Sequence, residues 1–244
     1  MTEPPNPPAA RLESVSKLYG NFAALRNVSV EFAVGSSTVV LGDNGAGKST
    51  LLRLLAGLIA PSRGTVSVLS DTPQRQRHRI AYMSHDAMLY DELSASENLS
   101  YFARLHSDGG CSVCNGSPEM ALRAVGLDPH LTRPVGQYSQ GMRQRASLAR
   151  VLQTDPELLL LDEPFSNLDV ASVHQMVELL KDFRTWPVIS PSSESSTRGR
   201  TIVLTTHQAK LAEPLADSIL TMRAGAIVPT APIAQIVAAQ SVIQ

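Results

Sequence analysis

Short apolar runs alternate with longer segments of helical periodicity along most of the 244-residue chain. Runs rich in Val, Leu, Ile and Thr that end at glycine, proline or charged residues predict buried strands. Segments in which apolar residues recur at three- and four-residue intervals predict amphipathic helices. The predicted strands are 11–16, 28–32, 36–41, 65–69, 80–83, 158–162, 201–205 and 218–222, and the predicted helices are 48–57, 97–105, 118–125, 140–153 and 170–184.

The order of these elements indicates one α/β domain with an insertion. Strands and helices alternate on either side of a stretch, about residues 86–150, that contains helical patterns and no strand pattern. This order predicts a parallel α/β core over residues 11–240 that carries an inserted helical subdomain. The proline-rich segment 1–10 predicts a disordered leader, and the Ser/Pro-rich segment 187–199 predicts a loop insertion.

One predicted strand leads directly into a glycine-rich loop. Residues 42–49 match the pattern G-x-x-x-x-G-K-[ST] between the apolar run 38–41 and a leucine-rich helix. Glycines let backbone N–H groups fold around phosphate oxygens, and the helix start adds the positive end of its dipole. Lys48 would bring charge to the β- and γ-phosphates, and the Ser49 hydroxyl would face Mg²⁺. The predicted ATP-binding residues of this loop are Gly42, Asp43, Asn44, Gly45, Ala46, Gly47, Lys48, Ser49 and Thr50.

Two carboxylates follow the apolar run 158–161. A buried strand that ends at Asp162 can aim this carboxylate at the phosphate loop, where it would hold Mg²⁺ together with Ser49. Glu163 would then be placed to polarise the water that attacks the γ-phosphate. A core strand that ends in solvated charges would produce the same pattern, but the phosphate loop on the same chain favours the catalytic interpretation.

A serine-led segment, 138–145, precedes these carboxylates in the chain. Its sequence Tyr-Ser-Gln-Gly-Met-Arg-Gln-Arg, taken with the loop and the carboxylates, strongly resembles the signature of the ATP-binding cassette (ABC) ATPases. Ser139 and Gly141 match that signature, whereas Gln140 replaces a glycine and Met142 a glutamine. The resemblance implies a P-loop NTPase fold of the ABC type, with a mostly parallel sheet and an N-terminal antiparallel β part. It also implies a head-to-tail dimer, in which Ser139, Gln140 and Gly141 of one copy cap the γ-phosphate bound by the other.

Further positions match the ABC family along essentially the whole chain. Tyr19 resembles the aromatic residue that stacks on adenine, and His207, after the run 201–205, resembles the histidine that senses the γ-phosphate. Residues 166–169 resemble the loop that links the two sites of a dimer, and 89–99 resemble the segment beside the groove for a membrane subunit. Each of these features also has an ordinary structural interpretation when it is considered alone. Tyr19 could be a loop tyrosine, His207 a structural histidine, and 89–99 the start of a helix.

His85 departs from the family pattern. The family usually places a glutamine there, touching Mg²⁺ and the attacking water, whereas histidine can donate to water or phosphate and titrates near neutral pH. The resemblance therefore implies Glu163, His207 and His85 as catalytic residues. His85, together with residues 205–208, makes the chain similar to the haem-exporter ATPase subunit of cytochrome c maturation. If His85 instead impairs turnover, the chain would be a slow or regulatory ATPase.

Composition and charge indicate which classes of binding partner, nucleic acid, membrane or protein, the chain is expected to have. The net charge of −1 gives no basic footprint for nucleic acid, and no apolar run approaches the roughly 18 residues that cross a bilayer. The N-terminus lacks the basic and apolar layout of a signal peptide. We therefore expect a location on the cytoplasmic side of the inner or plasma membrane, peripheral through membrane subunits. The expected partners are ATP, transmembrane permease subunits and a second copy of the chain.

Two rival functions share parts of this pattern. An ATPase subunit that exports another cargo, such as a drug or a lipid, would have the same fold and the same site. A soluble ABC ATPase acting on DNA or ribosomes is disfavoured by the single cassette, the absence of a coiled-coil pattern and the lack of a basic face.

A C-x-x-C pair, Cys111 and Cys114, stands in a Gly/Ser/Pro-rich stretch. A structural zinc normally requires four ligands, and no second Cys or His pair follows at matching spacing. The pair is therefore interpreted as part of a tolerated surface insertion.

Overall fold

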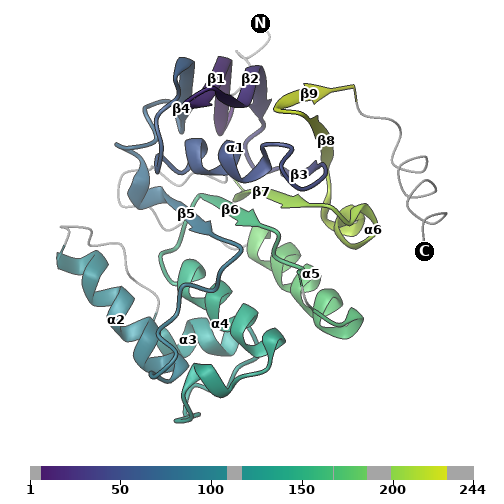
Figure 1. Cartoon of the computed structure of the whole chain (residues 1–244). Helices are drawn as coiled ribbons and strands as arrows, with labels where there is room; N and C mark the ends of the chain where they lie inside the picture. The colour runs from purple at the N-terminus through teal and green to yellow at the C-terminus, as the bar shows by residue number, and fades with distance from the viewer. Residues whose placement is uncertain (1–6, 109–116, 167, 186–198, 230–244) are drawn as a thin grey trace, which may run out of the picture.

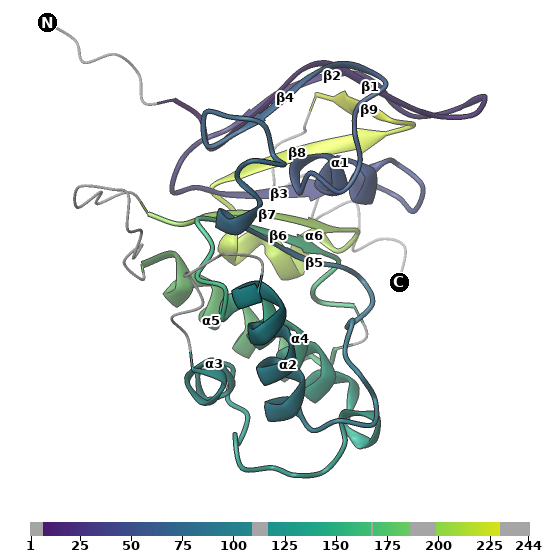
Figure 2. The same cartoon turned by 90° about the vertical axis from the view of Figure 1, so that its left-hand side faces the viewer.

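The computed structural model describes residues 7–108, 117–166, 168–185 and 199–229. Two sheets and a set of helices form its layers (Figures 1 and 2). The smaller sheet is antiparallel, with strand order β2-β1-β4, and Ala10 on β1 pairs with both Phe32 and Val68. Its strands are β1 (Ala10–Tyr19), β2 (Phe22–Phe32) and β4 (Arg63–Val68).

The larger sheet has six strands in the order β5-β6-β7-β3-β8-β9. All neighbouring strands in it run parallel except β9, which pairs antiparallel with β8. Since parallel neighbours end at the same edge of a sheet, the loops that follow β5, β6, β7 and β3 meet there. The strands are β3 (Ser37–Leu41), β5 (Ile80–Met83), β6 (Leu158–Asp162), β7 (Thr201–Thr206), β8 (Ser218–Arg223) and β9 (Ala226–Val228).

Helix α1 (Lys48–Leu55) lies between the two sheets, as Figure 2 shows from the side. Four leucines of this short helix are buried, and Gly57, with a φ of +70°, lies just beyond its end. The four leucines pack in one core with apolar residues of the antiparallel sheet and with Leu158, Leu160 and Val203 of the larger sheet. The helix therefore holds the two sheets together and fixes where its own N-terminus lies.

The other face of the larger sheet is covered by helices, which lie below it in Figure 1. On β6 the leucines alternate between the two cores: Leu158 and Leu160 face α1, whereas Leu159 and Leu161 face the helices. This two-residue period is that of a strand buried on both faces. The helices are α2 (Ala95–Asp108), α3 (Pro118–Ala124), α4 (Gln140–Leu152), α5 (Val170–Thr185) and the short α6 (Ala209–Ala212).

Polar residues cap these helices at the positions that the sequence favours. The Ser94 hydroxyl accepts from the Glu97 N–H at 3.2 Å, and the Glu97 carboxylate accepts from the Ser94 N–H at 2.8 Å. This reciprocal capping box fixes the start of α2. Ser117 and Ser139 accept backbone N–H groups in the same way at the starts of α3 and α4.

The architecture confirms the predicted parallel α/β core and inserted helices, with one correction at the N-terminus. The predicted leader, 1–10, extends too far, because Ala9 and Ala10 are buried and the Ala9 N–H donates to the Phe32 carbonyl at 2.8 Å. The prolines of this segment predict disorder, but Ala10 pairs with β2 and β4, and backbone hydrogen bonds hold Ala9 beside them. The strand β9 and helix α6 were not predicted, because both are short.

Some predictions fall on residues that the structure does not describe. Cys111 and Cys114 lie outside the described residues, as do nearly all of the predicted insertion 187–199 and the end of the predicted domain after residue 229. Among the residues that are described, no helix is both long enough and apolar enough to cross a membrane.

Replacing Leu52 tests the role of α1 as the link between the two sheets. Leu52 is fully buried, so Leu52→Ala should lower the free energy of unfolding by about 2–5 kcal/mol through lost burial and a cavity. Urea unfolding followed by circular dichroism measures this change. The matched control is Leu58→Ala, just beyond α1, where the leucine is 61% exposed and the expected change is within about 0.5 kcal/mol. Equal effects of the two substitutions would contradict this account of the core.

Candidate active site

The glycine loop connects the end of β3 to the start of α1. Gly47, the residue before the helix, has a φ of +102°, which side chains other than glycine rarely adopt. A Cβ atom there would also lie 2.6 Å from the Ala24 carbonyl oxygen. The close approach of the antiparallel sheet therefore requires glycine at this position, in addition to any need of a ligand.

Lys48 is the first residue of α1, and its ammonium group is held inside the loop. Its Nζ donates to the carbonyl oxygens of Gly42 at 2.6 Å and Asp43 at 3.2 Å. It also forms an ion pair with the Glu163 Oε1 atom at 3.2 Å, and only 6% of the lysine is exposed. The lysine of the loop and the second carboxylate thus meet directly, although they are far apart in the chain.

Asp162, at the end of β6, is buried and accepts hydrogen bonds from three hydroxyl groups. Its Oδ1 atom accepts from Ser49 at 3.0 Å and from Thr205 at 2.7 Å. Its Oδ2 atom accepts from the Tyr82 hydroxyl at 3.2 Å. These donors come from α1, β7 and β5, so the carboxylate joins three elements at one edge of the sheet.

Tyr82 stays a neutral donor over a wide pH range. Burial, and next the charge of the Asp162 carboxylate, raise the pKa of Tyr82 to about 12, while the neighbouring Arg53 guanidinium acts in the opposite direction. Arg53 is affected in return, because its hydrogen bond to Tyr82 raises the pKa of the guanidinium. The tyrosine therefore keeps its proton and its donation to Asp162 at physiological pH.

The two carboxylate oxygens of Glu163 contact different side chains, Lys48 and His207. Its Oε1 atom faces Lys48, and its Oε2 atom lies 3.1 Å from the His207 Nδ1 atom. The other ring nitrogen of His207 lies 3.2 Å from the Gln208 side-chain nitrogen. The backbone of Glu163 has a φ of +52°, an uncommon conformation for a residue other than glycine. The Glu163 side chain is 13% exposed and lines the cleft beside it.

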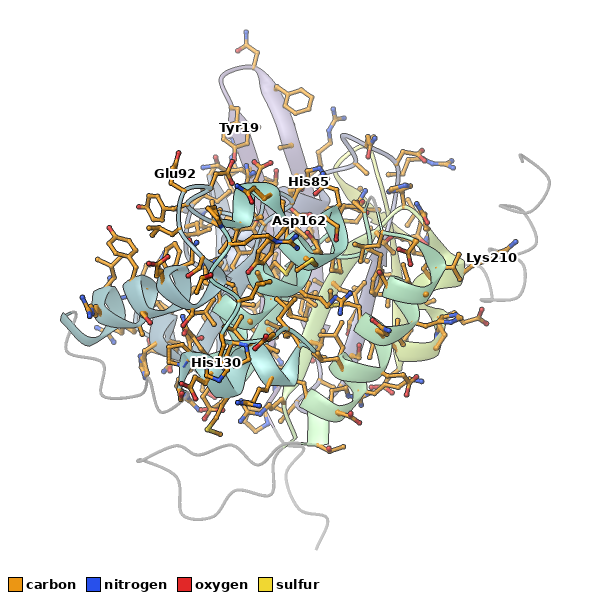
Figure 3. All side chains as sticks on the ribbon, turned by 90° about the horizontal axis from the view of Figure 1, so that it is seen from below. Tyr19, His85, Glu92, His130, Asp162 and Lys210 are labelled. Atoms are coloured by element: carbon orange, nitrogen blue, oxygen red, sulfur yellow. The ribbon has the colours of Figure 1, made fainter. Side chains whose placement is uncertain are left out.

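These residues line one open cleft of about 680 Å³. Seen from below in Figure 3, Tyr19, His85 and Asp162 lie on the same side of the molecule, whereas His130 and Lys210 lie away from them. The cleft is lined by Asp43, Asn44, Gly45, Ala46, Gly47, Lys48, Ser49, Thr50, Tyr19, His85, Asp162, Glu163 and His207, and also by Phe22, Ala24, Ser166 and Gln208. Apart from Gly42, whose carbonyl binds Lys48, and the signature residues, every predicted site residue therefore lies in this cleft.

Phe22, Ala24 and Gln208 were not predicted as parts of the site. Phe22 is 62% exposed and pairs with Tyr19 across the turn between β1 and β2. An exposed aromatic pair beside a predicted adenine contact was a signal that could have identified it. Ala24 and Gln208 offered no comparable signal, because each is placed in the cleft by the fold.

The predicted signature residues do not line this cleft. The Ser139 hydroxyl accepts from the Met142 N–H at 3.3 Å at the start of α4, and both Ser139 and Gln140 are exposed. Gln140 instead lines a neighbouring open cleft of about 480 Å³, while an added Cβ at Gly141 would contact Ser172. His85 and Ser166 line both clefts, so they stand at the boundary between them.

Comparison with known proteins identifies the family. A family model described as "ABC transporter" matches residues 25–166, more than half of the chain. The chain belongs to the ABC transporter family. It is the ATP-binding subunit of an ABC transporter, and its fold is that of this ATP-hydrolysing P-loop family. A model described as an AAA domain of a putative AbiEii toxin also matches residues 125–213.

Individual relatives cover most of this ABC subunit. The ATP-binding protein NatA of Bacillus subtilis is 32% identical over 84% of this chain and 80% of its own length. Nod factor export ATP-binding protein I of Cupriavidus metallidurans is 33% identical over 88% of this chain and 68% of its own. The sulfate/thiosulfate import protein CysA of Nocardia farcinica is 36% identical over 86% of this chain and 61% of its own.

Solved structures show the same fold at lower identity. The dimeric cassette MJ0796, solved with ADP and Pi, has a TM-score of 0.75 at 22% identity, covering 92% of this chain and 98% of its own. The cbiO1 subunit of Clostridium perfringens, part of the transporter complex cbiONQ, has a TM-score of 0.75 at 24% identity, covering 98% and 94%.

The environment of Tyr82 can be tested by its titration. Tyr82→Phe should leave the tyrosinate absorbance unchanged at about pH 11, because Tyr82 itself ionises only near pH 12, above the ordinary value of about 10. The pKa of Tyr82 is higher in the folded protein than in the unfolded chain, so the protonated phenol stabilises the fold. This contribution to the free energy of unfolding is complete below about pH 10 and is lost as the pH rises towards 12. The measurement is the absorbance difference between the wild-type protein and Tyr82→Phe. A difference already half complete near pH 10 would show that the phenol is not buried against Asp162.

Proposed function

We propose that the cleft binds ATP with Mg²⁺ and that Glu163 acts as the general base of hydrolysis. The observation that carries this proposal is the convergence of Lys48, Asp162 and Glu163. At a buried edge of the sheet, the Lys48 ammonium group pairs with the Glu163 carboxylate, and the adjacent Asp162 carboxylate accepts from the hydroxyl groups of Ser49 and Thr205. Lys48 would bind the β- and γ-phosphates, the N–H groups of residues 43–50 would surround them, and Tyr19 would stack on the adenine ring.

Asp162 and Ser49 suit a magnesium ion by their chemistry. Both offer oxygen atoms, which Mg²⁺ prefers, and the two atoms lie 3.0 Å apart at the mouth of the phosphate loop. Among the described residues, no group of three or more His, Cys, Asp or Glu side chains is placed to hold a metal ion by itself. Phosphate oxygens and water would have to supply the remaining Mg²⁺ ligands. A bound Mg²⁺ would neutralise charge that develops on the phosphates during hydrolysis.

Glu163, His207 and His85 are the proposed catalytic side chains. Glu163 has one oxygen on Lys48 and the other on His207, so an incoming phosphate that draws Lys48 away would free a carboxylate oxygen to accept a proton from water. His207 would remain beside the other oxygen, Oε2, and orient the attacked phosphate. His85, at the boundary of the two clefts, takes the place of the usual glutamine and would donate to water or phosphate.

The position of the signature favours a head-to-tail dimer. Ser139, Gln140 and Gly141 lie outside the phosphate cleft of their own chain, yet Ser139 begins an exposed helix terminus that can receive an anion. A second copy facing the first would bring these residues to the open side of the cleft. The solved cassette MJ0796, with the same fold, is described as dimeric.

Substitution of Glu163 tests the assignment of the base. Glu163→Gln keeps the size of the side chain but removes its ability to accept a proton, so ATPase turnover should fall by at least about a hundredfold. Binding of ATP, measured by titration calorimetry, should be retained. The control is Glu178→Gln on α5, whose exposed carboxylate pairs only with Lys181 in the described structure and should not affect turnover. Undiminished turnover in Glu163→Gln would remove Glu163 from the mechanism.

We further propose that the transported cargo is haem, in a step of cytochrome c assembly, through transmembrane permease subunits on the cytoplasmic side of the membrane. Support comes from His85 in place of the usual glutamine and from the sequence 205–208. A second candidate is a transporter of another cargo. It is favoured by the named relatives, which include a Nod factor exporter and a sulfate importer.

Deletion of the gene distinguishes the two cargoes. Loss of the subunit should abolish covalently bound haem in c-type cytochromes while leaving b-type haem spectra unchanged. Complementation with the wild-type gene should restore the c-type signal, and complementation with Glu163→Gln should not. Normal c-type cytochromes in the deletion strain would exclude the haem proposal and favour another cargo.

A further inference from the structure

One buried hydroxyl links the two carboxylates of the site. Thr205, on β7, has no exposed surface, and its Oγ1 atom donates to Asp162 Oδ1 at 2.7 Å. The same oxygen accepts from the Glu163 N–H at 3.1 Å. Since Thr205 pairs with Asp162 in the register of β6 and β7, the two side chains are held on neighbouring strands.

The direction of the two hydrogen bonds is determined by chemistry. An ionised carboxylate only accepts, and a backbone N–H only donates, so the single hydroxyl proton of Thr205 must point at Asp162. Its lone pairs are then turned towards the Glu163 N–H. The Thr205 hydroxyl therefore has one orientation that satisfies both groups, and this orientation links the position of Asp162 to that of Glu163.

The Glu163 backbone depends on the same residue. Its φ of +52° is uncommon for a side chain of this size, and Pro164 follows it directly. The Glu163 N–H is shared between the Thr205 carbonyl oxygen and the Thr205 Oγ1 atom, each at 3.1 Å. On the far side, the Gln144 side chain donates to the Pro164 carbonyl at 3.0 Å. Both ends of this short turn are therefore held by specific hydrogen bonds.

We propose that Thr205 is a positioning residue, whose hydroxyl sets the orientation of the Asp162 metal-binding carboxylate and of the Glu163 base relative to each other. This inference rests on the proposed function of those two carboxylates. Valine has the same shape as threonine but cannot donate, so it would leave Asp162 with one donor fewer and Glu163 with a weaker anchor. Serine keeps the hydroxyl and loses only a methyl group.

The experiment compares Thr205→Val with Thr205→Ser in the full chain. In Thr205→Val, kcat for ATP should fall about tenfold, since a hydrogen bond to a charged group is lost, while KM changes little. A second readout does not involve turnover: the affinity for a non-hydrolysable ATP analogue, measured by calorimetry with Mg²⁺ and with EDTA. The gain in affinity that Mg²⁺ provides should shrink several-fold in Thr205→Val, and the affinity in EDTA should be unchanged. Thr205→Ser should stay within about twofold of the wild type in both readouts.

The matched control is Thr38→Val on the neighbouring strand β3. Thr38 is also buried, and its hydroxyl contacts the Ser218 hydroxyl at 2.9 Å, away from the residues that line the cleft. This variant should match the wild type in both readouts. If Thr205→Val does not fold, as judged by thermal unfolding, Thr205→Ala is compared with Thr205→Ser instead, because alanine removes the hydroxyl without replacing it.

Two results would overturn the inference. One is wild-type turnover and wild-type magnesium dependence in the variant that lacks the hydroxyl; the other is an equal loss in Thr205→Ser, which would assign the effect to packing. Failure of the proposed function looks different. In that case the wild type would show no magnesium-dependent turnover, or Glu163→Gln would retain it, whatever Thr205 does.

Discussion

The buried carboxylate of Asp162 is the constraint on which the site depends. A carboxylate that is 2% exposed is stable in its charged form only if donors or cations replace the water it has lost. Here three hydroxyls do so, from Ser49, Tyr82 and Thr205. Each belongs to a different element, so the fold must bring α1, β5 and β7 to the end of β6 before this group can be buried. The strand order β5-β6-β7 achieves this by placing the two donor strands on either side of β6.

The two-layer core determines where the phosphate loop lies. Helix α1 is clamped between the antiparallel sheet and the larger sheet, and its N-terminus is thereby placed at the edge where β6 and β7 end. The antiparallel sheet contributes a second component, because the turn between β1 and β2 carries Tyr19 and Phe22 to the rim of the same cleft. The sheet that packs the helix thus also supplies the aromatic wall of the site.

The phosphate cleft is open to solvent, and the signature residues of the same chain do not line it. Ser139 and Gln140 are exposed at the start of α4, beyond the boundary formed by His85 and Ser166. Gln144, one turn into the same helix, donates to the Pro164 carbonyl directly after Glu163. The Gln144 side chain therefore connects the helical subdomain to the turn that contains Glu163. A shift of α4 would move the backbone next to Glu163.

The amino-acid sequence alone determined the elements and motifs that are contiguous in the chain. The glycine loop, the strand that ends in Asp162 and Glu163, and nearly all helices and strands follow from short patterns whose physical meaning is local. It erred where tertiary pairing overrode local composition, as at Ala9 and Ala10, and it missed the short β9. Only the tertiary structure revealed the roles of Tyr82 and Thr205. Tyr82 and Thr205 are separated from Asp162 by 80 and 43 residues along the chain, yet their hydroxyls contact its carboxylate. In the sequence alone, a tyrosine or threonine within an apolar run indicates only a good strand former. Which carboxylate oxygen each hydroxyl reaches depends on strand order and register, and these are set by the packing of the whole domain.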